Sequence, residues 1–177
     1  MYNSMTKKYI PVILGTGRVG RRSEKVAQYV AEVLNERTDA ESKLIDVADY
    51  TFGRTIPQWA KDPQTQPWQE IAKRADAFVL VFPEYNHGYP GELKILLDQD
   101  YDNYKGKKVL LCGVSAGGFG GTRGVENLLP VLRELSLIAL QPSLYFSKAE
   151  ETFKLSRVEL DKLYKESLNK AVDLLVK

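Results

Sequence analysis

Residues 77–82 read AFVLVF and contain no polar side chain, which is typical of a strand covered on both faces. Four other short apolar runs, at residues 10–14, 42–47, 108–114 and 138–146, are separated by stretches with apolar residues at helical spacing. This alternation predicts an α/β fold, a doubly wound five-stranded parallel sheet with helices on both faces.

Helices are expected at residues 23–34, 69–76, 91–98, 121–135 and 156–176. Three places modify the simple pattern. Pro11 cannot donate to a sheet ladder, so the first strand is expected to be regular only from Val12. Pro130 is expected to kink or break its helix. Residues 49–68 hold three prolines and four aromatic residues and are expected to form an irregular insert.

Length and composition narrow the class of protein. A chain of 177 residues without a linker is expected to be one domain, residues 1–177. A net charge of +2 is too small and too dispersed for a nucleic-acid protein. The single cysteine, Cys112, cannot form an internal disulfide, and neither a secretory signal nor a membrane span is visible. We therefore expect a cytoplasmic protein that does not bind nucleic acid or membranes.

Ligands of an open parallel sheet bind beyond the carboxyl ends of its strands. The loop after the first strand, residues 15–23, reads GTGRVGRRS. Its glycines can turn backbone N–H groups toward an anion, and the following helix presents further free N–H groups. Thr16 and Ser23 add hydroxyl groups, and Arg18 adds a guanidinium suited to phosphate oxygens. This loop predicts a site for a phosphate monoester, with the side chains of Arg21 and Arg22 expected in solvent.

The same glycines match G-x-G-x-x-G, the fingerprint of dinucleotide-binding Rossmann domains. That fingerprint requires an acidic residue at the end of the second strand, and only Asp46 lies near that position. Side chains such as Arg18 fit a terminal phosphate better than a pyrophosphate held by backbone. The Rossmann interpretation stays open as an alternative.

The loop after the third strand, residues 83–91, reads PEYNHGYPG. Its prolines and glycines predict a stiff turn whose backbone groups can bind one edge of a planar heterocycle. Tyr85 and Tyr89 are expected near that ring. His87 is the only histidine, and without a nucleophile beside it we favour a turn or binding role over proton transfer. No second His or Cys stands at ligand spacing, so no metal site is expected.

The loop after the fourth strand, residues 115–123, reads SAGGFGGTR. Small residues around Phe119 allow a ligand to approach the backbone closely. Its position after a neighbouring strand favours a wall of the same pocket over a merely flexible crossover.

The strings GTGRVGRRS and PEYNHGYPGELKILLD resemble the NADPH-dependent FMN reductase family, which includes quinone, chromate and azo-dye reductases. The resemblance extends from the first strand to the loop after the fourth. It implies a flavodoxin-like sheet of strand order 2-1-3-4-5 that binds FMN. Two features look individual, namely Gln99 in place of the family's common aromatic and the insert, which is expected to shape the substrate mouth.

The family's cofactor residues transfer onto all three loops. The implied FMN ligands are Thr16, Arg18, Gly20, Arg21, Arg22 and Ser23 for the phosphate, Pro83, Glu84, Tyr85, Asn86, His87 and Gly88 for the ring edge, and Ser115, Gly117 and Gly118 for its cover. No catalytic side chain is implied, since the flavin carries the chemistry. We further hypothesise that backbone N–H groups of residues 115–121 face the N1 and O2 edge of the ring.

The resemblance also implies partners. Hydride passes from NADPH or NADH to flavin N5, and a quinone, azo compound, metal oxyanion or free flavin then takes the electrons. A homodimer is implied, and tetramers occur in the family. The alternatives are a flavodoxin-type electron carrier, which is usually strongly acidic, a NAD-binding Rossmann domain, and an adapter that has lost the cofactor.

Overall fold

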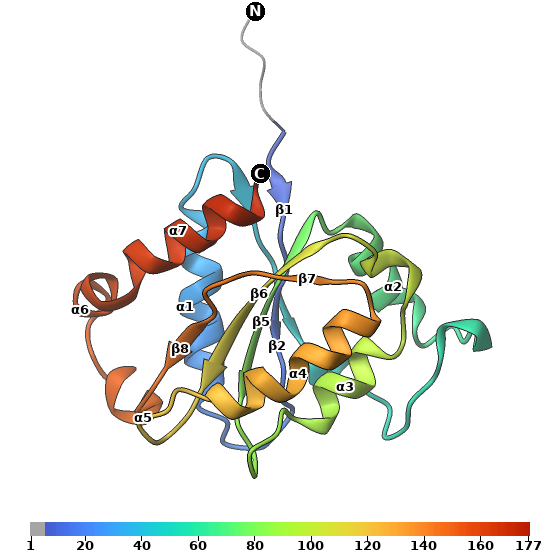
Figure 1. Ribbon diagram of the computed structural model, residues 1–177, viewed down its shortest axis with the longest axis horizontal. Helices are drawn as coiled ribbons and strands as arrows, with labels where there is room; N and C mark the ends of the chain where they lie inside the picture. The colour runs from blue at the N-terminus through green and yellow to red at the C-terminus, as the bar shows by residue number, and fades with distance from the viewer. Residues whose placement is uncertain (1–5) are drawn as a thin grey trace, which may run out of the picture.

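The computed structural model describes residues 6–177 (Figure 1). Its strands are β1 Lys8–Tyr9, β2 Val12–Leu14, β3 Ala40–Glu41, β4 Leu44–Asp46, β5 Ala77–Pro83, β6 Lys108–Val114, β7 Ile138–Ala139 and β8 Leu144–Phe146. Its α-helices are α1 Ser23–Asn35, α2 Gln66–Arg74, α3 Gly91–Leu97, α4 Thr122–Glu134, α5 Ala149–Thr152, α6 Arg157–Leu160 and α7 Glu166–Leu175. Short 3-10 turns cover Val47–Asp49, Gln58–Ala60 and Asp102–Tyr104. None of the helices in this part of the chain has the length and apolar character needed to span a membrane.

The main sheet is parallel and has the order β4-β2-β5-β6-β7, with β8 also pairing with β6. In terms of the five predicted strands this order is 2-1-3-4-5, as the resemblance implied. The strand segments outnumber the prediction because the fifth strand is divided in two and because β1 and β3 precede the predicted first and second strands. β4 lies at the edge, where its few apolar residues can be accommodated.

The first strand is regular only from Val12, as predicted, and Pro11 separates it from the short strand β1, which was not predicted. β1 pairs with β3, and β2 pairs separately with β4 from Val12 onward. The chain nevertheless stays in the sheet across the gap, since Val12 N donates to Lys43 O at 3.0 Å and Val79 N donates to Pro11 O at 3.1 Å. The proline therefore interrupts the ladder without redirecting the strand.

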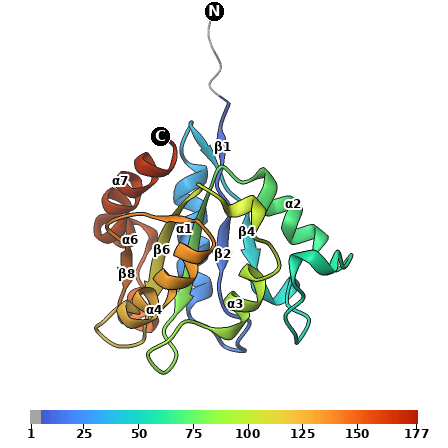
Figure 2. The ribbon, with the colours of Figure 1, turned by 45° about the vertical axis from the view of Figure 1, so that its right-hand side comes forward.

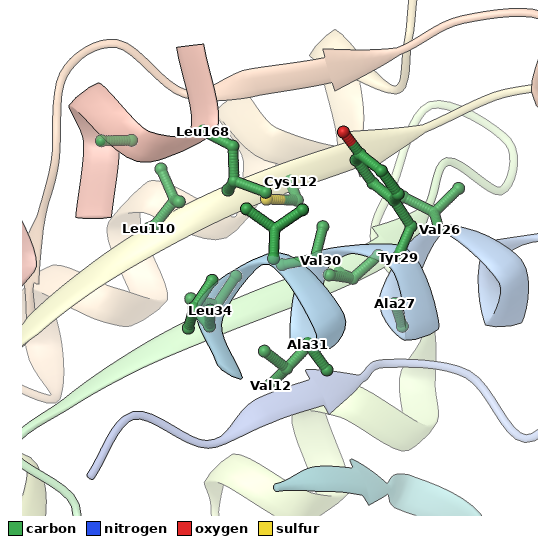
Figure 3. Close-up of a cluster of buried hydrophobic side chains, with 14 of the residues drawn as sticks. Val12, Val26, Ala27, Tyr29, Val30, Ala31, Leu34, Leu110, Cys112 and Leu168 are labelled. Carbon is green, nitrogen blue, oxygen red and sulfur yellow. The ribbon is translucent and has the colours of Figure 1, made fainter. Parts of the chain in front are cut away.

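Alternate side chains of β5 enter two different cores. Those of residues 77, 79 and 81 pack with α1 and α7, and those of residues 78, 80 and 82 pack with α2, α3 and α4. Figures 1 and 2 show these helices on opposite faces of the sheet. Figure 3 shows Val30 and Leu34 of α1 gathered with Leu110 and Cys112 of β6 and Leu168 of α7. Burial on both faces explains why this strand has no polar residue.

The fifth strand and the helix before it differ from expectation. Residues 138–146 form two short strands, β7 and β8, with Pro142 between them. Pro130 does not break α4, which runs as one helix from Thr122 to Glu134. The closing helix begins at Arg157, after the N-cap residue Ser156, whose hydroxyl forms a capping box with Glu159. It then passes through a π-helical turn at Asp161–Lys165. α5 was not predicted.

The helix α2 begins three residues earlier than expected, at Gln66. Pro67 stands in its first turn, where a missing N–H costs nothing. Trp68 therefore belongs to the helix and not to the insert. Its ring is fully buried, and its Nε1 donates to the Tyr104 hydroxyl at 2.8 Å. The remainder of the insert is irregular apart from the 3-10 turns, as predicted.

Candidate functional site

Three loops follow β2, β5 and β6 and lie together at the lower edge of the sheet in Figure 1. We call residues 15–23 the first loop, 83–91 the second loop and 115–123 the third loop. Together they line one cavity of about 230 Å³. Its walls are Arg18, Gly20, Arg21, Arg22, Ser23, Pro83, Glu84, Tyr85, Val114, Ser115, Ala116 and Ala149. The predicted convergence of the three loops is confirmed.

Two glycines determine the path of the first loop. A Cβ on Gly15 would lie 2.8 Å from the Cβ of Phe82, so the chain leaves β2 pressed against β5. Gly20 has a φ of +70°, in the left-handed region where L side chains are strained. The turn around it is closed by Arg21 N, which donates to Arg18 O at 3.3 Å. This tight path brings Arg18 back beside the start of α1.

Arg21 is not the solvated charge that we expected. Its Nη1 donates to Asp46 Oδ1 at 2.9 Å and to the carbonyl of Thr16 at 2.8 Å, and its Nη2 donates to Asp46 Oδ2. Its side chain is only 15% exposed. Burial alone would lower the pKa of Arg21, but Asp46 and the nearby Glu24 raise it above its ordinary value. The expectation failed because Asp46 is separated from it by 25 positions along the chain.

The other two arginines of the first loop are less confined. Arg22 is half-exposed and forms an ion pair with Glu150 of α5 at 2.6 Å. Arg18 forms no ion pair with any residue of 6–177, and its guanidinium lies over the Tyr85 ring, 5.4 Å from the centroid. Arg18 is therefore the guanidinium of this loop that remains free for an anion.

Ser23 lies between the first loop and α1 with an unsatisfied hydroxyl. Its Oγ is buried and finds no hydrogen-bond partner among the described residues. Leaving such a group unpaired costs about 1–3 kcal/mol, so a ligand that completes it would bind favourably. α1 has 13 residues, and no side chain caps its N-terminus. Free N–H groups, the helix dipole and the Ser23 hydroxyl together fit a phosphate group.

Thr16 joins the first loop to the second. It is fully buried, and its hydroxyl lies 3.2 Å from the hydroxyl of Tyr85. Its Oγ1 also accepts a hydrogen bond from Arg18 N at 3.3 Å. Thr16 does not line the cavity, and its role is to hold Tyr85 and Arg18 beside it.

The second loop contains a tight two-residue turn at Asn86 and His87. Tyr85 and Gly88 exchange two backbone hydrogen bonds of 2.9 Å, and Asn86 and His87 both have positive φ, +48° and +66°. Two left-handed residues in succession are typical of a type I′ hairpin turn. Asn127 of α4 donates from Nδ2 to the carbonyl of His87. This geometry agrees with a turn role for His87, which does not line the cavity.

Glu84 ties the second loop to the start of α4. Its carboxylate accepts hydrogen bonds from Arg123 N at 3.1 Å and from Arg123 Nη1 at 3.3 Å. A Cβ on Gly124 would lie 3.2 Å from the carbonyl oxygen of Gly88, so the two segments pack closely. The carboxylate thus satisfies one of the free N–H groups at the start of α4, which lacks a capping side chain of its own.

Both hydrogen-bond donors of Ser115 in the third loop are already used. Its N–H donates to Phe146 O at 3.1 Å, and its hydroxyl donates to Gly117 O at 2.8 Å. The carbonyl of Ser115 accepts from Ala149 N at 3.0 Å, which places Ala149 in the cavity wall. Within our hypothesis for the flavin N1 and O2 edge, the N–H of Ser115 is therefore unavailable, and those of residues 116–121 remain.

The predicted site residues divide into two groups. Nine of them line the cavity: Arg18, Gly20, Arg21, Arg22, Ser23, Pro83, Glu84, Tyr85 and Ser115. The others lie outside its lining: Thr16, Asn86, His87, Gly88, Gly117 and Gly118. Sequence reasoning missed Val114 and Ala149, and it placed Ala116 in the third loop without naming it as a ligand. Val114 adjoins Ser115 and could have been included, whereas Ala149 carries no local signal.

A larger cavity of about 990 Å³ lies away from the three loops. It is bounded by the insert, including Trp59, and by residues 98–102 after α3. None of the predicted cofactor residues lines it. The smaller cavity is the better candidate because only there do phosphate-type donors and the three loops meet. No group of three His, Cys, Asp or Glu within residues 6–177 is arranged to hold a metal ion.

The fold and the cavity define a class, a flavodoxin-like α/β protein with a cavity lined by three loops at the carboxyl edge of its sheet. Comparison with known proteins agrees with this class. The model of the family described as NADPH-dependent FMN reductase matches residues 9–151. The chain belongs to this family, as the motifs of its loops predicted. This membership confirms the predicted cofactors, FMN and NAD(P)H, and the predicted class of enzyme, an oxidoreductase.

Individual relatives support the same assignment. The chain is 35% identical over 120 residues to the NAD(P)H-dependent FMN reductase C4B3.06c of Schizosaccharomyces pombe, covering 63% of this chain and 59% of that protein. It is 30% identical over 145 residues to the NAD(P)H-dependent FMN reductase LOT6 of Saccharomyces cerevisiae, covering 72% and 75%. The structure of FerB, a flavoenzyme NAD(P)H:(acceptor) oxidoreductase from Paracoccus denitrificans, matches with a TM-score of 0.80 at 22% identity and covers 95% of this chain and 97% of that one. This last likeness concerns the fold.

Proposed function

We propose that the chain holds FMN in the three-loop cavity, oxidises NADPH or NADH, and passes the electrons to a small-molecule acceptor. The observation that carries this proposal is the unsatisfied Ser23 hydroxyl beside the uncapped start of α1. When bound, the flavin ring supplies the redox chemistry by accepting a hydride equivalent from the nicotinamide. The protein therefore has to bind, orient and shield, and needs no nucleophile or metal.

At the phosphate end, the proposed ligands are the Arg18 guanidinium, the Ser23 hydroxyl and the N–H groups of Gly20 and Arg22. Arg18 contributes a charge with no carboxylate partner in the described structure, and charge-assisted hydrogen bonds to phosphate are the strongest available here. Arg21 serves this end through its side-chain contacts, because its own N–H already donates to Arg18 O.

At the ring end, we assign the backbone of Pro83, Glu84 and Tyr85 to one edge of the flavin. Asn86, His87 and Gly88 keep this strand end in shape through the hairpin turn. Gly117 and Gly118 are assigned to the cover of the ring, where a Cβ would meet nothing within 4 Å in the protein alone. Open space at both glycines leaves room for a planar ligand.

We further propose a homodimer in the cytoplasm. Trp59 and Tyr101 line the same larger cavity and expose 84 and 39% of their surface, and neighbouring exposed aromatic residues are typical of contacts between proteins. Cys112 is buried and unpaired, which agrees with a reducing compartment. Light scattering at micromolar concentration should give the mass of a dimer, and a monomer there would contradict this part of the proposal.

The principal test is purification without added cofactor, followed by an absorption spectrum and titration with FMN. NADPH and NADH oxidation are then measured against a quinone, an azo dye, a metal oxyanion and free flavin. We expect bound FMN and steady turnover with at least one acceptor. A protein that does not bind FMN in this titration refutes the proposal.

The same assay separates the remaining alternative, an electron carrier that binds FMN without nicotinamide turnover. Such a protein would be yellow and would oxidise neither NADPH nor NADH at steady state. The net charge of +2 disfavours it, since carriers of this type are usually strongly acidic.

A further inference from the structure

The contacts of Asp46 point to a role that neither the motifs nor family membership assigns. Asp46 is the last residue of edge strand β4 and lies outside the loops that line the cavity. Its two carboxylate oxygens accept hydrogen bonds from the two terminal nitrogens of Arg21, and Oδ1 also accepts a hydrogen bond from Ala48 N at 2.9 Å. One carboxylate thus joins the edge strand, the following 3-10 turn and the first loop.

Arg21 carries this connection into the first loop. The nitrogen that binds Asp46 Oδ1 also donates to the carbonyl of Thr16 at 2.8 Å, five positions earlier in the chain. The loop is therefore bridged across its base from Thr16 to Arg21. Gly17 packs on the same support, since a Cβ there would lie 3.5 Å from Ala48 Cβ. A bidentate guanidinium–carboxylate pair fixes direction as well as distance.

The bridged segment presents the proposed phosphate donors. Thr16 holds Arg18 N at its Oγ1, and Gly20 and Arg22 flank Arg21 on the cavity wall. If the bridge opened, these donors would have to be ordered again when a ligand binds, and that ordering would reduce the affinity.

We propose that Asp46 is a positioning residue, which fixes the first loop through Arg21 in the arrangement that binds the cofactor phosphate. This inference rests on the proposed function. It also gives a different role to Asp46 as the acidic residue that the Rossmann interpretation required at the end of the second strand. Here that carboxylate is occupied by Arg21 and Ala48 N and is not available for a ribose hydroxyl.

Asp46→Asn provides a test because positioning and simple electrostatics predict opposite changes in the affinity for FMN. Asparagine retains the shape and can still cap Ala48 N, but it loses the charge that holds Arg21. Removing a negative charge near a dianionic phosphate would by itself tighten binding. Loss of positioning weakens it, and we expect the FMN dissociation constant to rise by about tenfold or more.

Asp49→Asn is the matched control. Asp49 lies three residues further on, at the end of the 3-10 turn that Asp46 caps, and its exposed side chain makes no hydrogen bond to the described residues. It reports the effect of removing one negative charge, and we expect FMN binding to be unchanged or slightly tighter. Arg21→Lys keeps the charge but loses the fork. Combined with Asp46→Asn, it should add little further loss, because both changes break one interaction.

Riboflavin, which lacks the phosphate, separates this role from general support of the fold. Apoprotein is titrated with FMN and with riboflavin by flavin fluorescence, and we expect Asp46→Asn to change only the FMN value. Unchanged or tighter FMN binding overturns the proposal, and so does an equal loss for both ligands. Wild-type protein that binds neither flavin refutes the proposed function itself, together with this inference, before any variant is measured.

Discussion

Removing the Ser23 hydroxyl should affect the free and the FMN-bound protein in opposite ways. In the free protein, Ser23 Oγ is buried without a partner, so Ser23→Ala deletes an unsatisfied polar atom. Such a change is nearly neutral or stabilising. The thermal midpoint of the apoprotein should therefore stay the same or rise slightly.

FMN binding should become weaker in the same variant. A hydrogen bond to a charged group contributes about 1.5–3 kcal/mol. Because 1.4 kcal/mol corresponds to a tenfold change, the dissociation constant should rise by roughly 10- to 150-fold. Riboflavin, without a phosphate, should bind as it does to the wild type. Fluorescence titration of apoprotein with both flavins, with melting curves of each apoprotein, gives all these values.

Ser42→Ala is the matched control for this experiment. Its Oγ is likewise buried and unpartnered in the described structure, but Ser42 lies between β3 and β4 and does not line the cavity. It should share the neutral effect on the apoprotein and leave FMN affinity unchanged. Equal FMN affinity in Ser23→Ala and wild type would refute our placement of the phosphate, and a similar loss in Ser42→Ala would show an indirect effect.

Four further outcomes are expected. Arg18→Ala should weaken FMN binding by about 1.5–3 kcal/mol in a titration while the melting curve is unchanged, and unaltered affinity would mean that Arg18 faces solvent. Gly15→Ala, whose Cβ would meet Phe82 Cβ at 2.8 Å, should lower the unfolding free energy in urea by about 1–3 kcal/mol. Trp68→Phe removes the donor to the buried Tyr104 hydroxyl and should cost about 1–3 kcal/mol in the same assay, with Trp59→Phe as the exposed control. Hydrogen bonds from Lys165 and Arg157 lower the pKa values of Glu36 and Asp161 below their usual 4.5 and 3.8. A lowered native pKa adds stability above the unfolded value, so the thermal midpoint should fall as the pH drops below these values, and Asp161→Asn should flatten that fall.

The apolar runs predicted the strands well because the pattern that marks a strand lies within its own segment, whereas the strand order followed from the resemblance to the family. Residues 77–82 are apolar throughout because both faces of this strand are covered. β4 has few apolar residues because it lies at the edge of the sheet. The main local error, the start of α2, has a local cause. Pro67 was assigned to the insert, although proline is well tolerated in the first turn of a helix.

The side-chain contacts of the site were harder to predict because they join distant parts of the chain. Motifs identified all three loops, yet the partner of Arg22 is Glu150, and Ala149 enters the wall only through its bond to Ser115. A motif shows that a loop is rich in donors. It does not show which of those donors the fold has already used, as with both donors of Ser115.

The charge balance of the first loop shows how this distinction affects binding. Arg21 pairs with Asp46 and, at 3.7 Å, with Glu24, and Arg22 pairs with Glu150, so Arg18 is the one guanidinium of the first loop without a carboxylate partner among residues 6–177. The other proposed donors, the Ser23 hydroxyl and backbone N–H groups at the start of α1, are neutral or only partly charged and act at short range. A free anion would gain from Arg18 but would still have to be held in place. A phosphate attached to a ring that the second and third loops also bind is held there by the rest of the ligand, and the joining of these walls in one cavity thus favours a complete flavin nucleotide over either of its halves.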